Sequence, residues 1–588
     1  MSGCLKSACG FLLAAGALGF GGSAEGAIFR VGTGAGCDTS SVQQAVEWAN
    51  APGEHEIRLT ENELAREDVR IDNDINAARL VLSGGWNRCT SSTASGDTGI
   101  AGLPNGNTWG PLQIARSDLG APQRRVILRN LFIVGEWLTL TPGEELTRVA
   151  VDVRGGRVEL ESSIIYHGSP GLQALFGANV FVDSASTISE NFSPDNDQFL
   201  GGGISCGSRS DANSGENTVV RIRGRVQLNR AVNGAGILAR HGCTVVLEPG
   251  AFVHSNEASG SGGGLYLETG ADLFAGGDSV STVRIHSNLA DYGGGLYLRS
   301  SGTTAQASNL EIHGNEALFG GGGVLVNQNA LLRLNRSSAV SCPDAPYCNT
   351  LVGNRCNALN GSALYVAPGG RAEISRAFVN QNVGSPSPGP VIRVEGAFSH
   401  LRLEGVAFWN NRGSAVLEAV HEATVEAGFL SLARNAWLVN GGGQTLAWSF
   451  AASSSSGATI DIQASILEDT RGSAGPGNTG WCLLMDDATN MVAGVSVVGA
   501  DPRFVDPDDG NLHLDSTSPA IDFCNENFFP AWTDIDLQQR GYDSAGNING
   551  IGTFDLGFDE FVGAVGNREI FEDGFESGDS SAWSAAVE

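Results

Sequence analysis

The sequence predicts an all-β fold of stacked coils, a parallel β-helix, on three observations. One unit recurs four times between Val253 and Val366, with an apolar residue, Asn, a run of small residues and a short apolar strand. Asn256, Asn288 and Asn315 are 32 and 27 residues apart, a period typical of repeat architectures. Apolar residues alternate within each unit, and Gly triplets stand where each Gly would cost a helix ~1 kcal/mol.

Each recurring residue of these units has a predicted structural role. The Asn side chains are expected to stack as a hydrogen-bonded ladder, and the Gly triplets to turn a tight corner, because Gly adopts positive φ without steric cost. Two interior columns of apolar side chains are expected. The first holds Leu265, Leu296, Val324 and Leu364, and the second Leu267, Leu298, Val326 and Val366.

The N-terminal residues predict export. Residues 1–24 have the features of a secretory signal peptide, with Lys6, an apolar run over Phe11–Phe20 and small residues before Ala24. No later stretch is apolar and long enough to predict a membrane span. The expected location is extracellular or on the outer-membrane surface.

Residues 28–125 are expected to form an N-terminal cap and the first coils, and residues 126–500 the β-helix itself. Asp38-Thr39-Ser40 can cap a helix whose apolar stripe would cover the first coil. That stripe consists of Val42, Ala45, Val46 and Ala49. Strands are expected over Glu56–Leu59, Val69–Ile71 and Arg79–Leu82, and a long surface loop over Ala94–Gly120.

Eleven cysteines indicate disulfides in an exported chain. Beyond Cys4 and Cys9, which fall in the signal segment, three pairs are predicted. They are Cys37 with Cys89, Cys206 with Cys243, and Cys482 with Cys524. Cys342, Cys348 and Cys356 form an odd trio, whose pairing the sequence leaves open.

The charge balance excludes one class of partner. With 64 Asp and Glu against 35 Lys and Arg, the net charge is −29. Nucleic acid and anionic lipid are therefore not expected as partners, since both are bound by basic surfaces. The acidity suits cations, or solubility outside the cell.

The coil pattern resembles the right-handed, single-stranded β-helix of the pectin lyase-like superfamily. Its Asn units and Gly triplets also resemble the repeats of chlamydial polymorphic outer-membrane proteins, most clearly at Gly262–Leu265, Gly293–Leu296 and Gly321–Val324. Residues 501–563 resemble the choice-of-anchor Q domain of bacterial surface proteins, through Asp501-Pro502, Ser518–Asp522, Asp536, Arg540, Asp555 and Glu560. Residues 564–588 are expected to form a C-terminal tail similar to short tags of secreted proteobacterial proteins.

The resemblance implies two classes of function. Enzymes of this fold cleave acidic polysaccharides with carboxylates on one sheet, but no pair of Asp residues falls on one coil face here. Arg240-His241-Gly242 and Arg221-Ile222-Arg223 match polygalacturonase motifs only in part and in the wrong order. We therefore expect a non-catalytic, monomeric surface or secreted protein for adhesion or for interaction with glycans or cell-surface proteins. A pectate lyase-like or polygalacturonase-like enzyme is the alternative.

Two sets of residues are candidate sites. Tyr266, Tyr297 and Tyr365 alternate with interior Leu and Val, so they must point outward, either to stack on sugar rings or to stabilise the coil stack. Calcium is the one candidate cofactor, because oxygen ligands at close spacing suit it, although Asp and Asn also form turns. Its candidate ligands are Asp506, Asp508, Asp509, Asp543, Asn547, Asn549 and Asp555.

Overall fold

The structure is a computed structural model that describes most of residues 26–562. The gaps are 61–63, 73–75, 97, 104–109, 116–124, 136–147, 194–199, 208–216, 279, 336–348, 385–388, 439–445, 449, 488–491, 494–495, 526–532, 537 and 542–551. Several sequence predictions concern residues outside the described ranges. They are the signal peptide, the C-terminal tail, Cys342, Cys348, Asp543, Asn547 and Asn549.

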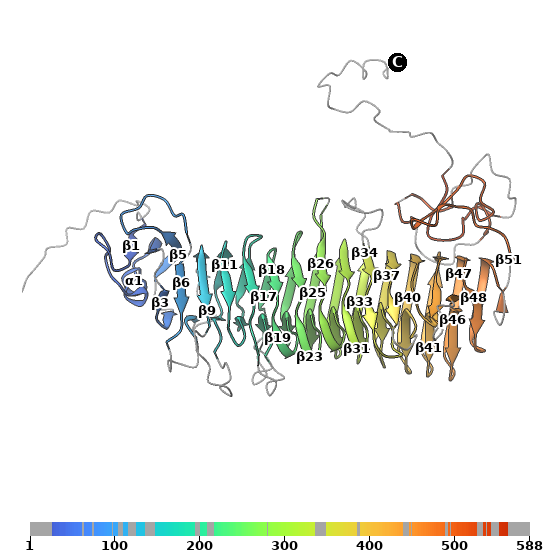
Figure 1. Cartoon of the computed structure of the whole chain (residues 1–588), viewed down its shortest axis with the longest axis horizontal. Helices are drawn as coiled ribbons and strands as arrows, with labels where there is room; N and C mark the ends of the chain where they lie inside the picture. Colours follow the sequence, from blue (N-terminus) through green and yellow to red (C-terminus); the bar gives the residue numbers. More distant parts are fainter. Residues whose placement is uncertain are drawn as a thin grey trace, which may run out of the picture.

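The chain forms an all-β parallel β-helix, as predicted, with its coils stacked along the long axis (Figure 1). Among the described residues, three parallel sheets make up the walls. Sheet A contains 29 strands, sheet B 14 and sheet C 6. Sheet A has two columns of strands, so each central coil has four short strands.

One central coil illustrates the path of the chain. It contains β24 (Leu265–Glu268) in sheet B, β25 (Asp272–Gly276) and β26 (Val283–His286) in sheet A, and β27 (Leu289–Tyr292) in sheet C. Gly293–Gly295 then lead into β28 (Leu296–Arg299) of the next coil. Leu265 pairs with Leu296, and Leu296 with Val324 on β32 (Val324–Asn327), so the register repeats from coil to coil.

The interior of the coils is apolar. Both predicted columns are present, and their side chains are fully buried in one continuous core. Since each strand presents alternate residues to the inside, the period-two pattern of the sequence decides which side chains enter this core.

The predicted Asn ladder is also present, and it continues from Asn191 to Asn435. The Nδ2 of Asn288 donates to the carbonyl of Val253 at 3.0 Å and to Oδ1 of Asn315 at 2.9 Å. Asn256 makes the equivalent bond to Oδ1 of Asn288 at 3.0 Å. A side-chain amide both donates and accepts, so each Asn donates a hydrogen bond to the Asn of one neighbouring coil and accepts one from the Asn of the other.

The Gly triplets turn the corner between sheets C and B, as predicted. The first Gly of each triplet has positive φ, at +67° for Gly262 and +62° for Gly293. The third Gly packs tightly instead, because a Cβ on Gly264 would lie 2.5 Å from the carbonyl oxygen of Gly295. A residue larger than Ala at this third position would push neighbouring coils apart, and Ala363 occupies it in the fourth repeat.

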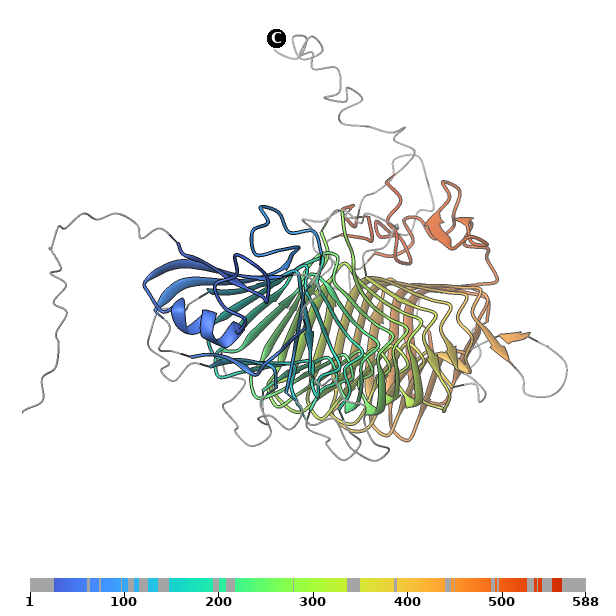
Figure 2. The same ribbon diagram turned by 60° about the vertical axis from the view of Figure 1, so that its left-hand side comes forward.

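The N-terminal end is capped by helix α1 (Val42–Trp48), which lies across the first coils (Figure 2). Its buried face is formed by the predicted stripe, Val42, Ala45, Val46 and Ala49. The N-cap lies one residue after the predicted Asp38-Thr39-Ser40 segment. It is Ser41, whose Oγ accepts the N–H of Gln44 at 3.1 Å.

Parallel pairing begins before residue 126. The expected strands are β2 (Gly53–Thr60), β4 (Val69–Ile71) and β5 (Ala77–Trp86), and β1 (Ile28–Val31) pairs with β2. The expected loop over Ala94–Gly120 was wrong in part. It contains β6 (Thr98–Ala101) and β7 (Leu112–Ala115), because Ile100 and Leu112 fill the core between the polar stretches.

The C-terminal region, residues 501–562, does not continue the coils. Its hairpin of β52 (Phe504–Asp506) and β53 (Asn511–Leu514) and its loops lie against the side of the last coils (Figure 1). A second apolar cluster joins Leu512, Ile521 and Phe558 of this region to Phe378 and Phe429 of the coils.

The structure contains the three predicted disulfides, Cys37–Cys89, Cys206–Cys243 and Cys482–Cys524. Three such bonds indicate an oxidising environment. Cys356 of the open trio is buried with a free thiol. Within the described ranges, no helix combines the length and the hydropathy that crossing a membrane requires.

Candidate functional site

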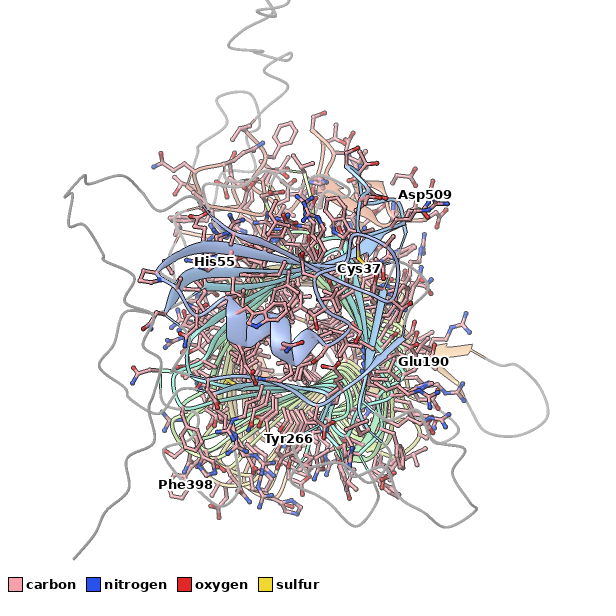
Figure 3. The ribbon with its side chains drawn as sticks, turned by 90° about the vertical axis from the view of Figure 1, so that its left-hand side faces the viewer. Cys37, His55, Glu190, Tyr266, Phe398 and Asp509 are labelled. Atoms are coloured by element: carbon pink, nitrogen blue, oxygen red, sulfur yellow. A yellow bond between two sulfur atoms is a disulfide. The ribbon has the colours of Figure 1, made fainter. Side chains whose placement is uncertain are left out.

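Three tyrosines, Tyr266, Tyr297 and Tyr365, lie in one row on the outer face of sheet B, with Leu325 between the last two. Figure 3 labels Tyr266. Tyr266 and Tyr297 point away from the coil interior, yet they are only 4% and 8% exposed. Their rings stack at 5.0 Å, and Leu325 and Ala367 extend the same cluster. Because these two rings cover each other, the geometry at Tyr266 and Tyr297 matches a ladder that stabilises the coil stack and gives no support to stacking on sugars.

A charged cluster continues this row beyond Tyr365, which pairs with Arg393 on β39 (Ile392–Glu395). Arg393 donates to Glu395 at 3.1 Å and to Glu418 of β41 (Ala415–Val420) at 2.5 Å. The hydroxyl of Tyr365 donates to Glu395 at 2.8 Å. One guanidinium therefore holds two carboxylates of neighbouring coils.

The two carboxylates differ in their affinity for a proton. Burial raises the pKa of Glu418 more than the charge of Arg393 lowers it. Burial acts in the same direction on Glu395, but the hydrogen bond from Tyr365 and the charge of Arg393 outweigh it and lower the pKa. Two carboxylates with pKa values shifted in opposite directions are a feature of acid–base pairs.

Sequence reasoning missed this cluster because it searched for paired Asp residues only. The signal was present: Arg393 and Glu418 occupy corresponding outward positions of two adjacent strands, and Glu395 is the next outward residue after Arg393. A search for Glu as well as Asp at outward positions one coil apart would have found it.

An open groove of about 500 Å³ lies on the outer face of sheet A. Its floor is a row of side chains from four successive coils, Val246, Phe274, Gln306 and Arg333. These belong to β21 (Thr244–Leu247), β25, β29 (Thr304–Ser308) and β33 (Leu331–Asn335). The Phe274 side chain is 41% exposed in this row, so part of its ring is open to a ligand.

Polar side chains stand at both ends of the groove. At one end Glu248 accepts hydrogen bonds from Arg223 at 2.7 Å. At the other end Arg333 donates to Glu373 at 3.0 Å, and Asn335 accepts the hydroxyl of Ser375 at 2.9 Å. Among the described residues that line the groove, Glu248 is the one carboxylate. An exposed aromatic ring between polar side chains suits binding of a ligand that has both an apolar face and hydroxyl groups.

The calcium candidates that the structure describes lie in two different settings. Asp506, Asp508 and Asp509 are exposed near the hairpin tip, where Asp509 lies at the molecular periphery (Figure 3). Asp508 pairs with Arg434 at 2.8 Å, and Asp506 accepts the N–H of Asp509, a turn contact.

Asp555 is fully buried instead. Its carboxylate accepts the N–H of Asp522 at 2.7 Å and that of Phe561 at 2.6 Å. Burial, together with the neighbouring charge of Glu560, raises the pKa of Asp555 to about 8. These two hydrogen bonds show that Asp555 holds loop backbone in place, and calcium binding by these residues stays a prediction.

Comparison with known proteins gave no family model, curated protein or solved structure that matches this chain. The resemblances to the pectin lyase-like superfamily, to polymorphic outer-membrane protein repeats and to choice-of-anchor Q domains therefore stay predictions. The parallel β-helix itself follows from the strand pairing.

Proposed function

We propose that this chain is an exported, non-catalytic β-helix protein of the cell surface or extracellular space that binds a glycan in the groove around Phe274. One observation carries the proposal: a partly exposed aromatic ring on the groove floor, with hydrogen-bonding side chains at both ends. A sugar ring offers an apolar face and a rim of hydroxyls, which such a surface complements.

Three further features support export and an interaction role. The three disulfides fit an oxidising compartment. Residues 1–24 have the features of a signal peptide, and the net charge of −29 favours solubility over contact with anionic surfaces. Residues 501–563 resemble a domain of bacterial surface proteins.

The proposal is tested by measuring binding of the purified protein to a polysaccharide panel. We expect Phe274→Ala to weaken binding of the recognised glycan about tenfold or more, which corresponds to about 1.4 kcal/mol. Phe319→Ala is the matched control, because Phe319 is 46% exposed on the different wall formed by sheet C. Equal binding by the wild type and Phe274→Ala would remove the groove from the proposal.

The charged cluster favours a second candidate function, hydrolysis of a polysaccharide with Glu418 as acid and Glu395 as base or nucleophile. Its support is the pair of opposite pKa shifts around Arg393. The same panel separates the two candidates when it is scored for new reducing ends. Release by the wild type that is lost in Glu418→Gln would favour the enzyme, and binding without release would favour the interaction protein.

A further inference from the structure

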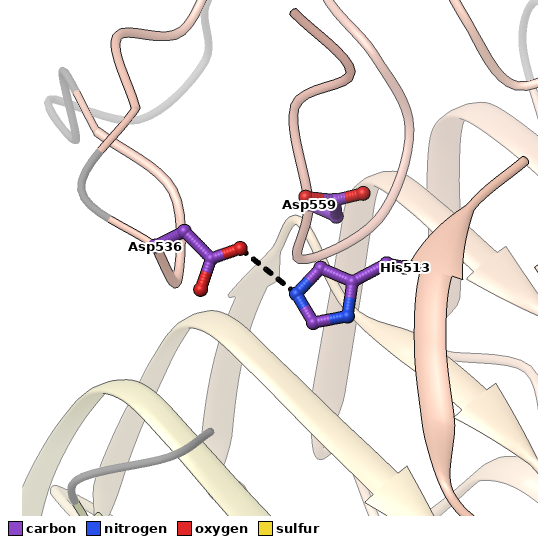
Figure 4. Close-up of side chains that lie close together, drawn as sticks. All are labelled: His513, Asp536 and Asp559. Carbon is purple, nitrogen blue, oxygen red and sulfur yellow. Dashed lines mark hydrogen bonds and ion pairs between the residues drawn. The ribbon is translucent and has the colours of Figure 1, made fainter. Parts of the chain in front are cut away.

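Three segments of the C-terminal region bring one imidazole and two carboxylates together (Figure 4). His513 comes from β53, Asp536 from the loop after the hairpin, and Asp559 from the last described loop. One ligand atom of each lies within 4.8 Å of the other two. The imidazole distinguishes this cluster from the exposed acidic side chains at the hairpin tip.

The imidazole of His513 is held in one orientation. The Oδ1 of Asn511 lies 2.6 Å from Nδ1 of His513 and also accepts the backbone N–H of His513 at 3.2 Å. Since a carbonyl oxygen only accepts, Nδ1 carries a hydrogen and donates. Nε2 is then the nitrogen that faces the carboxylates, 2.9 Å from Asp536. A metal-binding imidazole is oriented in this way by an outer hydrogen bond.

Asp559 is positioned through its carboxylate, and Asp536 through its backbone N–H. Asp559 is 5% exposed and accepts the N–H of Leu514 at 2.8 Å, so it is fixed beside the histidine strand. The buried carboxylate of Asp534 accepts the N–H of Asp536 at 2.9 Å and that of Glu560 at 3.0 Å. One side chain thus joins the two loops that carry the aspartates.

The surroundings of the cluster are strongly acidic. Residues 501–562 contain thirteen Asp and Glu against two Arg and no Lys. Asp522, Asp534, Asp555, Asp559 and Glu560 are all buried. Of the two arginines, Arg540 is buried close to Glu560 at 3.8 Å. Few positive charges in this region would therefore repel a bound cation.

We propose that His513, Asp536 and Asp559 bind one divalent transition-metal ion, for which Zn²⁺ is the best match. Zn²⁺ takes imidazole nitrogen and carboxylate oxygen in a tetrahedral arrangement, and three protein ligands leave one position for water. Calcium fits less well, because it takes six to eight oxygen ligands.

The distances between the three candidate ligand atoms are close to those that a bound Zn²⁺ requires. Bonds of about 2.0–2.2 Å place tetrahedral ligand atoms roughly 3.3–3.6 Å apart, so separations within 4.8 Å have to close by about 1.5 Å at most. Asp536 is the ligand free to move, because its side chain is 36% exposed while Asp559 is buried. The bound ion would fasten the hairpin to both loops.

The test is binding of Zn²⁺, and of Co²⁺ as a spectroscopic substitute, to the chelator-treated full-length protein. We expect one ion per chain, a visible Co²⁺ absorption of tetrahedral type and a higher unfolding temperature with Zn²⁺. Asp536→Asn should weaken Zn²⁺ binding at least tenfold, and His513→Gln should abolish it. Asn511→Ala should weaken it about 10–100-fold by releasing the imidazole.

Two control variants test whether Zn²⁺ binding depends on this cluster alone. Asp501→Asn removes an exposed acid just before the same hairpin, and His286→Gln removes an imidazole of the coils, so both should bind Zn²⁺ like the wild type. Zn²⁺ binding that is absent from the wild type, or unchanged in Asp536→Asn, overturns the proposal. Because Asp536 is partly exposed, its variant decides the question even if His513→Gln fails to fold.

Discussion

The central coils, Val253–Val366, and the C-terminal region, residues 501–562, are built from different polar side chains. In the coils the most frequent buried polar side chain of the wall is the amide of Asn, and each Asn of the ladder bonds the Asn of the next coil. In the C-terminal region they are carboxylates such as Asp534 and Asp555, which accept backbone N–H groups of loops.

The difference follows from hydrogen-bonding capacity. An amide donates and accepts, so the same residue can be repeated from coil to coil without an unsatisfied group. An ionised carboxylate only accepts, so it can gather the donors of irregular loops but cannot form a ladder with its own kind. The repeated coils are therefore joined by one recurring Asn–Asn hydrogen bond. In the C-terminal region each carboxylate instead holds a different set of loop N–H groups.

The largest expected effect comes from placing a carboxylate in the ladder. Asn288→Asp would set an oxygen against the carbonyl of Val253 and Oδ1 of Asn315, where Nδ2 now donates. We expect the free energy of unfolding to fall by about 4 kcal/mol, since a buried charge and unpaired acceptors result. Urea unfolding followed by circular dichroism measures it.

The matched control is Asn335→Asp, at an exposed position whose Oδ1 already accepts the hydroxyl of Ser375. Its stability should stay within about 0.5 kcal/mol of the wild type. Similar losses in both variants would contradict the distinction between amide and carboxylate positions.

A smaller effect is expected from cutting the covalent link between the two regions. Replacing Cys482 and Cys524 with Ser removes the bond that ties the C-terminal region to β49 (Asn478–Met485). We expect a loss of about 3 kcal/mol, concentrated in residues 501–562. Limited proteolysis with mass spectrometry should show faster cleavage there while the coils stay protected.

The corresponding double variant of Cys206 and Cys243 provides the comparison, because that bond lies within the coils. It should lower overall stability without selective cleavage of the C-terminal region. Equal protection of that region in both variants would show that the apolar contacts alone hold it in place.

The smallest effect concerns pH. His254, His286 and His313 stack on three successive coils, with ring centroids 4.7 and 4.5 Å apart. Burial, then the neighbouring charges of His313, His254 and Arg284, lowers the pKa of His286 to about 4. The unfolded chain, with a His pKa near 6.5, therefore binds more protons between pH 6.5 and 4, and stability falls as the pH drops through that window.

Because His286 is partly exposed, solvent screening reduces this effect to about 1 kcal/mol. Unfolding midpoints at pH 7 and pH 4.5 measure it. In His286→Gln the difference between the two midpoints should shrink, and an unchanged difference would assign the pH dependence to other groups.

The sequence predicted the parts of the molecule that repeat. Asn288 and Leu296 could be placed because the same residue recurs one coil away, and stacking follows from the period. It could not show that Tyr266 and Tyr297 cover each other, since the exposure of an outward side chain depends on its neighbours.

The candidate sites were harder to predict for the same reason. Phe274 is open to solvent and Glu418 is held by Arg393 because of side chains from other coils. His513, Asp536 and Asp559 meet through three loops with no period. Where each contact is unique, a single sequence contains no second copy from which to infer it.

The coil-to-coil register also limits how the chain can change in length. Each wall position pairs with the equivalent position of the next coil. Removing the segment from Asn256 to Ser287 would therefore place Asn229 beside Asn288, and equivalent positions would still pair. A deletion that begins and ends at non-equivalent positions would leave the ladder and both apolar columns out of register. The coils differ in length, with ladder Asn residues 32, 27 and 39 positions apart, so the wall tolerates loops of different size but requires strands to be removed or added as whole coils.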